Sequence, residues 1–236
     1  MDTFPEVFDI LAGPPAVAGM IVTAGVIFLT SRWRLSLAAL LVQYLLVALA
    51  MTRLVQPELA IVRGLVGVLV VPILYITAQR VDESRRLSER DSRERQLFGL
   101  PLDWNAGPLG MPLRILTLFL VFLALVRFFP DYRSLLPGAI VSGPQVPRDI
   151  ALASFWLAGV GTAGILLSGE ALRVAPAALT ILAGFDLIYA GLEPNLAVVG
   201  FFGALVLLVS LALSYLAGIQ GLSEAVMGVD EEAGEL

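Results

Sequence analysis

The stretch from Ala177 to Tyr215 reads AALTILAGFDLIYAGLEPNLAVVGFFGALVLLVSLALSY, and it decides the fold of this chain. It contains two long apolar runs that meet at a short turn, 191–195. An apolar run of about 20 residues is long enough to cross the hydrocarbon core of a membrane as a helix. The stretch therefore predicts a membrane hairpin.

The composition of the whole chain agrees with this prediction. Of its 236 residues, 58% are hydrophobic, and the mean hydropathy is +0.88. Soluble domains are roughly 45–50% apolar, and their helices need a polar face that most of these runs lack. We therefore expect an all-α polytopic membrane protein with about seven transmembrane helices. The expected spans are 14–31, 35–52, 56–77, 112–129, 150–168, 172–192 and 195–217.

An internal repeat relates the two ends of the chain. The sequence PELAIV at 57–62 matches PNLAVV at 194–199, and each follows an Ala-Ala-Leu, at 38–40 and 177–179. Spans 1–3 thus correspond to spans 5–7. Because a single helix, span 4, joins them, the two three-helix repeats have the same orientation and form a parallel repeat. We expect one integral membrane domain, 1–236, made of repeat 1 (14–78), a cytoplasmic loop (79–111), a connector helix (112–129), repeat 2 (150–217) and an acidic C-terminal tail (218–236).

The arginines predict the orientation of the chain in the membrane. All fifteen cationic side chains are arginines, and ten lie on one side of the expected spans against four on the other. Short loops rich in arginine remain in the cytoplasm. We therefore expect a multi-pass protein of a bacterial-type inner membrane, with its N-terminus outside and with the C-terminus and loop 79–112 in the cytoplasm. The ten are Arg32, Arg34, Arg80, Arg85, Arg86, Arg90, Arg93, Arg95, Arg114 and Arg173, and the four are Arg53, Arg127, Arg133 and Arg148.

Loop 79–112 has two parts. Residues 80–97 alternate arginine with acidic residues, which predicts an exposed helix with ion pairs along it. Residues 98–112 are rich in Pro and Gly and include Trp104. The loop is either a solvated connector or a docking surface for a cytosolic partner.

The absence of two residue types limits the chemistry of the chain. It contains no Cys and no His, which excludes disulfides, iron–sulfur ligation and thiolate or imidazole chemistry. The sequence GVGTAG at 159–164 matches the GxGxxG pattern of dinucleotide sites. That pattern needs a preceding strand, whereas here it falls within a span, where small residues let helices approach closely. We interpret it as a packing motif and expect no cofactor.

Asp186 is the strongest candidate for a functional residue. A carboxylate within a membrane span costs roughly 2.5–3.5 kcal/mol on insertion scales, so its presence suggests a function. Two interpretations stay open. The carboxylate either holds helices together or relays protons, since a carboxylate in dry surroundings can exchange protons near neutral pH.

Arg63 is the natural partner of Asp186. Arg63 follows the proline of one turn by six residues, and Asp186 precedes the proline of the other turn by eight. At 1.5 Å per residue both lie about 9–12 Å below their turns, so their depths match. We predict that Asp186 faces the protein interior and pairs with Arg63. We name Gln43 and Tyr189 as polar neighbours, although the simpler interpretation of Gln43 is an interhelical hydrogen bond.

Three short motifs resemble those of a known family. The sequence RLS at 34–36, followed after six residues by Gln43, is similar to the second span of membrane component E of hydrogenase-4. The sequence VVPI at 70–73 is similar to the third span of that family, and GFDLIYA at 184–190 resembles the membrane-carboxylate signature of the K-type subunit of NADH–quinone oxidoreductase, to which component E is related. Asp186 replaces the Glu of that signature. Arg63 lies about one turn before the position of the family's third-span Lys, and span 195–217 lacks a second membrane Glu.

The resemblance implies an integral membrane subunit of a complex-I-like or group 4 hydrogenase-like respiratory assembly. It would be a non-catalytic subunit of an oxidoreductase complex, in which Asp186 contributes to proton translocation with Arg63, Gln43 and Tyr189. Its partners would be other membrane subunits and lipid, with no nucleic acid and no bound cofactor. Two alternatives remain, namely a non-catalytic scaffold subunit of another bioenergetic or photosynthetic membrane complex, and a small stand-alone transporter.

Overall fold

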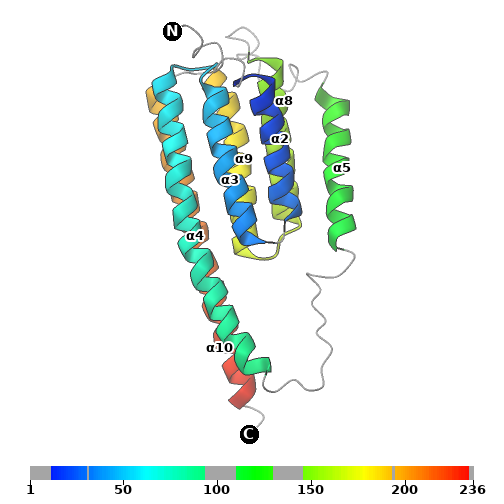
Figure 1. Cartoon of the computed structure of the whole chain (residues 1–236), viewed down its shortest axis with the longest axis vertical. Helices are drawn as coiled ribbons and strands as arrows, with labels where there is room; N and C mark the ends of the chain where they lie inside the picture. Colours follow the sequence, from blue (N-terminus) through cyan, green and yellow to red (C-terminus); the bar gives the residue numbers. More distant parts are fainter. Residues whose placement is uncertain (1–11, 31, 94–109, 130–145, 193–194, 234–236) are drawn as a thin grey trace.

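The computed structural model describes residues 12–30, 32–93, 110–129, 146–192 and 195–233, which form seven α-helices and no strand (Figure 1). Six of the helices are long and apolar enough to cross a membrane, whereas α2 is a shorter apolar helix of 16 residues. This is the all-α polytopic membrane fold that the sequence predicted. The helices are α2 (Pro14–Leu29), α3 (Trp33–Met51), α4 (Pro57–Arg93), α5 (Gly110–Phe128), α8 (Arg148–Leu166), α9 (Ala171–Leu192) and α10 (Leu196–Ala233).

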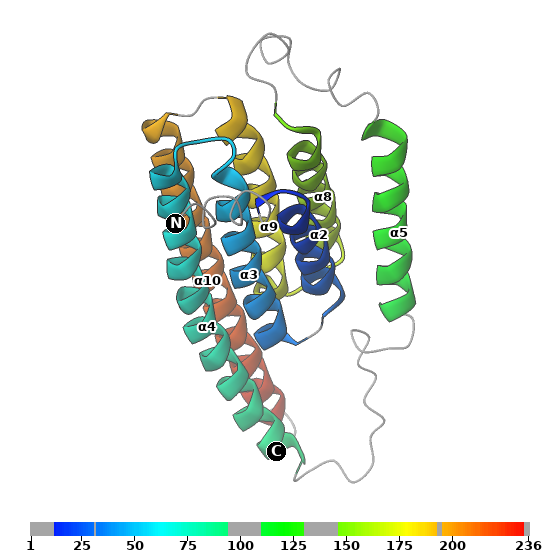
Figure 2. The same ribbon diagram turned by 45° about the horizontal axis from the view of Figure 1, so that its top comes forward.

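Six helices form two layers of three. Helices α2, α3 and α4 make one layer, and α8, α9 and α10 make the other (Figure 1; Figure 2). Helix α2 packs against α8, α3 against α9, and α4 against α10, and each pair runs in the same direction. Helix α5 lies outside the layers, beside α8 and α2. The parallel repeat predicts that the two halves superpose after a rotation about an axis along the helices, and this remains a prediction.

The two ends of the bundle differ. At one end α3 and α9 finish and α4 and α10 begin, and we call it the turn end. At the other end α4 and α10 continue beyond the remaining helices, and we call it the projecting end (Figure 1). Arg32, Arg34, Arg80, Arg114 and Arg173 belong to the projecting end.

The two projecting helices are longer than the sequence predicted. Helix α4 continues to Arg93, where we had placed a loop from 79, and α10 continues to Ala233, where we had placed a tail from 218. Residues 78–93 contain neither Gly nor Pro, so nothing in that segment stops a helix. The helices also support each other. Thr77 and Ser214 share a hydrogen bond, and a Cβ added at Gly221 would lie 3.4 Å from the Val81 side chain.

The helix predicted at 80–97 thus exists as far as 93 and continues α4 without a break. Residues 94–109, which belong to the predicted docking surface for a cytosolic partner at 79–112, lie outside the described residues. The same is true of residues 234–236 at the end of the predicted acidic tail.

The packing between α8 and α9 depends on glycine. A Cβ added at Gly161 would lie 2.7 Å from the Ala177 carbonyl oxygen, and one added at Gly164 would lie 2.8 Å from the Ala177 Cβ. Across the same interface, a Cβ on Gly184 would lie 2.7 Å from the Ser154 carbonyl oxygen. The GxGxxG sequence at 159–164 therefore serves close helix packing, as interpreted from its place within a span.

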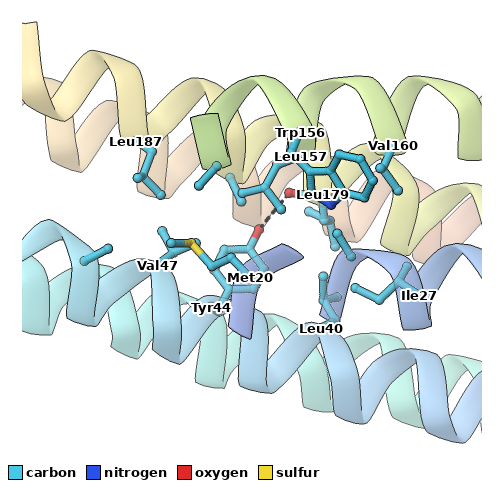
Figure 3. Packing of buried hydrophobic residues seen from close by; sticks show 14 of the residues in the cluster. Met20, Ile27, Leu40, Tyr44, Val47, Trp156, Leu157, Val160, Leu179 and Leu187 are labelled. Carbon is cyan, nitrogen blue, oxygen red and sulfur yellow. Dashed lines mark hydrogen bonds between the residues drawn. The ribbon is translucent and has the colours of Figure 1, made fainter. Parts of the chain in front are cut away.

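The core lies between the two layers. Met20, Leu40, Leu157, Leu179 and Leu187 are almost fully buried there and come from four different helices (Figure 3). The outer faces are apolar as well, since α5 contributes no buried residue and large hydrophobic side chains of α4 and α10 are exposed. An apolar core surrounded by apolar outer faces is the arrangement of a bundle with lipid around it.

Labelling of introduced cysteines tests which end faces the cytoplasm. The chain has no native Cys, so Gln56→Cys at the turn end and Glu83→Cys at the projecting end, both exposed, are clean probes. Because arginines gather at the projecting end, we expect an impermeant thiol reagent added to intact cells to label Gln56→Cys and not Glu83→Cys. The reverse pattern would contradict the predicted orientation.

Candidate functional site

A buried ion pair joins the two halves of the chain. The Arg63 Nε of α4 contacts the Asp186 Oδ2 of α9. The side chains are 0% and 3% exposed, so both charges lie within the protein and neither faces lipid. The structure therefore brings together the two residues whose matching depth predicted a pair.

The pair spans the diagonal of a square of four helices. Helix α3 packs against α4 and α9, and α10 also packs against both, so α4 and α9 occupy opposite corners. Arg63 is the seventh residue of α4, and Asp186 is the seventh from the end of α9. At 1.5 Å per residue, each lies about 9 Å from the turn end of its helix. The long arginine side chain bridges the diagonal at this depth.

Small residues make room for the guanidinium. Gly203 of α10 lies beside it, since a Cβ at this position would lie 3.9 Å from Arg63 Nη1 and 3.2 Å from Val66 Cγ2. A Cβ added at Gly67, one turn after Arg63 in α4, would collide with the Cβ of Tyr44, so a larger residue there would push α3 away. The glycines let α3 and α10 close around the pair, which removes it from lipid.

Tyr44 of α3 belongs to this region and was missed by the sequence reasoning. It is fully buried, and its hydroxyl donates a hydrogen bond of 3.5 Å to the Leu179 carbonyl oxygen of α9 (Figure 3). The hydroxyl is close enough to interact electrostatically with both Arg63 and Asp186. The available signal was its place directly after Gln43, in an otherwise apolar run.

The two predicted polar neighbours have different positions. Gln43 is fully buried about 12 Å from the turn end of α3, at a depth similar to that of the pair. Within the described part of the chain, neither of its amide atoms has a hydrogen-bond partner, so the proposed interhelical hydrogen bond is not formed. Tyr189 lies outside the buried region. Its side chain is 46% exposed and packs on Phe202 of α10, with ring centroids 5.2 Å apart.

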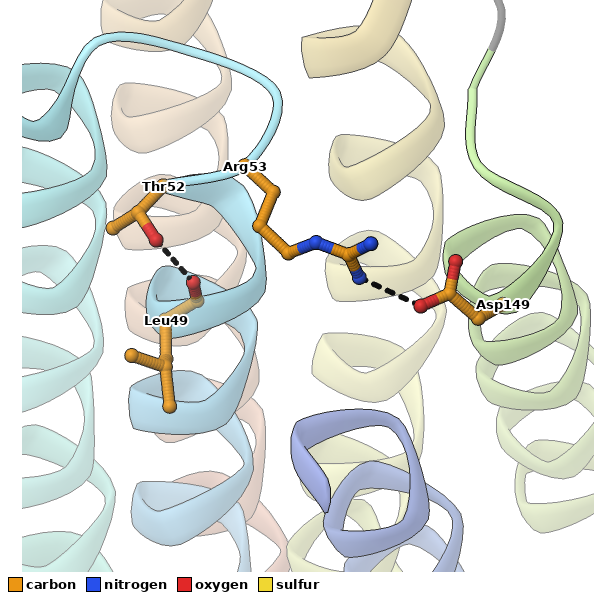
Figure 4. A network of polar contacts seen from close by, with 4 residues as sticks. All are labelled: Leu49, Thr52, Arg53 and Asp149. Atoms are coloured by element: carbon orange, nitrogen blue, oxygen red, sulfur yellow. Dashed lines mark hydrogen bonds and ion pairs between the residues drawn. The ribbon is translucent and has the colours of Figure 1, made fainter. Parts of the chain in front are cut away.

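A second ion pair provides a contrast. Arg53, in the turn between α3 and α4, donates a hydrogen bond of 2.6 Å from Nη1 to Asp149 Oδ2 at the start of α8 (Figure 4). Both side chains are about 30% exposed. Nearby, Thr52 caps the end of α3 through its hydroxyl, which donates to the Leu49 carbonyl oxygen at 2.7 Å (Figure 4). This pair also links the two halves, but at the end of the bundle and within reach of water.

No family model, no curated protein and no solved structure matches this chain.

Proposed function

We propose that this protein is an integral membrane subunit of a complex-I-like or group 4 hydrogenase-like respiratory assembly, in which Asp186 takes up and releases a proton. The observation that carries the proposal is the Arg63–Asp186 pair, two charges buried at membrane depth between the halves of the chain. Ionisable residues inside a membrane bundle are expensive, and they commonly mark ion and proton pathways. The motif resemblance at 184–190 supports the same assignment.

The pair offers a simple proton-coupled step. While the pair is closed, the guanidinium favours the charged form of the Asp186 carboxylate. A shift of α4 relative to α9 would separate the two groups, and a buried carboxylate without a cation favours the protonated form. A proton from the aqueous phase, carried by water, then binds one Asp186 oxygen. When the pair closes again, the carboxylate returns this proton to water and regains its negative charge.

In this proposal, protons reach the pair from the turn end. A groove of about 480 Å³ opens there beside Glu58 and Val62, and it ends short of Arg63 and Asp186, neither of which lines it. Deeper in the bundle, the Gln43 amide and the Arg63 Nη1 and Nη2 atoms have no protein hydrogen-bond partner among the described residues. Buried polar atoms of this kind usually bind water. Together these groups support proton access to Asp186 from the turn end.

The test is a neutral replacement of the whole pair. Co-purification of the tagged chain in mild detergent first identifies its partner subunits, and proton movement is then followed in vesicles that contain that assembly. We expect Arg63→Leu with Asp186→Leu to assemble normally, because no unpaired charge is left. We also expect its rate of proton movement to fall at least about a hundredfold, the lower end of the range typical of removing a group that transfers protons.

The exposed pair supplies the matched control. Arg53→Leu with Asp149→Leu also removes one ion pair between the halves, and we expect it to retain proton movement. If the buried double variant retains it as well, Arg63 and Asp186 are only a structural pair. The chain is then better described as a non-catalytic scaffold subunit. Purification of the chain without any partner would instead favour the stand-alone transporter.

A further inference from the structure

A cavity of about 300 Å³ opens at the projecting end, between α2, α3, α8 and α9. It lies toward the opposite end of the bundle from the Arg63–Asp186 pair, and neither of these residues lines it. Its wall is mixed. The inner part is apolar, whereas charged side chains gather at the helix ends. The apolar wall includes Ala24, Ile27, Phe28, Leu37, Leu74 and Val160.

Two arginines face this cavity. Arg114 reaches it from α5, and its Nη1 donates a hydrogen bond of 3.4 Å to the Phe28 carbonyl oxygen near the end of α2. Arg173 comes from the first turn of α9, and its Nε lies 3.6 Å from Glu170 Oε2. The two guanidinium groups are close enough to repel each other.

The charges at the cavity do not balance. Glu170 is the only acidic residue in the described lining, against the two guanidinium groups, so the lining carries one net positive charge. The start of α3 adds to this, because Trp33 and Ser36 line the cavity and the N-cap residue Arg32 makes no side-chain hydrogen bond to the first turn of that helix. Helix N-termini carry partial positive charge. An anion between Arg114 and Arg173 would reduce the repulsion between them. It would also be attracted to the start of α3.

We infer that this cavity binds a phosphate-bearing amphiphile, with its phosphate between Arg114 and Arg173 and its apolar part against α2, α3 and α4. Guanidinium groups are well suited to phosphate, because their N–H groups match its oxygens in pairs. Basic pockets between membrane helices are a common place for anionic lipid headgroups.

The cavity volume limits the ligand. At about 30 Å³ per water molecule, 300 Å³ is the space of about ten waters. A phosphate group with its first attached carbons fits, whereas a whole lipid does not, so lipid chains would have to leave the cavity. Arg114 belongs to α5, which contributes no buried residue, so lipid can reach this side of the cavity. The headgroup of an anionic membrane lipid and a soluble phosphate ester with an apolar substituent are two sources of the same chemistry. The inference does not depend on any role of Asp186.

Native mass spectrometry of the full chain in detergent tests the inference. The protein is incubated with phosphatidylglycerol, with phosphatidylcholine, or with hexyl phosphate. We expect wild type to retain phosphatidylglycerol about tenfold better than phosphatidylcholine, and Arg114→Gln and Arg173→Gln each to lower that retention roughly fivefold. Arg34→Gln is the matched control, because Arg34 is exposed at the same end of α3 and does not line the cavity.

The outcomes separate the sources of the phosphate group. Retention of hexyl phosphate without phosphatidylglycerol, lost in both cavity variants, would support a soluble ester. Equal retention of the two lipids, without retention of hexyl phosphate, would overturn the inference. An equal loss of phosphatidylglycerol retention in Arg34→Gln and in the two cavity variants would also overturn it. Ala24→Leu keeps both arginines and fills part of the apolar wall, so it should also weaken binding. Unchanged binding in that variant would refute the placement of the apolar part. Helix content measured by circular dichroism shows that each variant is folded.

Discussion

Replacing Asp186 by Leu is expected to destabilise the protein by about 3–5 kcal/mol, the usual cost of removing one member of a buried ion pair. The replacement leaves the Arg63 guanidinium fully buried without an anion, and an arginine cannot lose its charge by giving up a proton. Thermal unfolding in detergent, read by circular dichroism, measures the change. We also expect a lower yield of monodisperse protein.

Two variants make this prediction specific. Arg63→Leu added to Asp186→Leu should recover most of the lost stability, because apolar residues can replace a buried ion pair at little net cost. Arg53→Leu removes one member of the exposed pair with Asp149 and should cost at most about 1 kcal/mol. If Asp186→Leu lowers the free energy of unfolding no more than Arg53→Leu does, the charges of Arg63 and Asp186 are not desolvated as described.

Replacing Gly161 by Ala is expected to lower the free energy of unfolding by about 1–3 kcal/mol, the range for forcing an extra carbon into a packed interior. The new Cβ would lie 2.7 Å from the Ala177 carbonyl oxygen and 3.0 Å from the Ile181 backbone nitrogen. Because both atoms belong to the backbone of α9, a side-chain rotation cannot relieve the contact. Helices α8 and α9 would have to separate, and unfolding in detergent would show the loss.

Gly200 in α10 offers the control for this change. It is also a helical glycine, but a Cβ at this position would meet nothing within 4 Å. Gly200→Ala should therefore be neutral, or stabilising by up to about 1 kcal/mol through the higher helix propensity of alanine. Equal effects at the two positions would mean that Gly161 matters only for helix propensity and not for packing against α9.

Much of the fold could be predicted from the sequence, because a membrane imposes a minimum length on each apolar run. Each of the seven helices in the described residues overlaps a predicted span. Equal distances from the two turns also sufficed to pair Arg63 with Asp186. The extensions of α4 and α10 could not be predicted in full, because they depend on contacts between the two helices, such as that of Gly221 with Val81.

The surroundings of the pair were harder to predict. A soluble helix shows by its polar face which side is buried, but a span that is apolar all round does not show how it is rotated. Tyr189 was therefore placed beside the pair although it is half exposed, and Tyr44 was overlooked although it is fully buried. Residues three positions apart, such as Asp186 and Tyr189, differ by about 60° around a helix, which is enough to move one of them to the outer face.

Arg63 lies in the first half of the chain and Asp186 in the second, and this division determines which halves can associate. In the repeat alignment, position 63 corresponds to Gly200, so the second half has no equivalent of Arg63. A first half paired with a copy of itself would bury two cations without an anion, and two second halves would bury two carboxylates without a cation. If the two halves are expressed as separate fragments, they should therefore associate as a heterodimer and not as either homodimer. Only the heterodimer pairs the one buried charge of each fragment with its opposite.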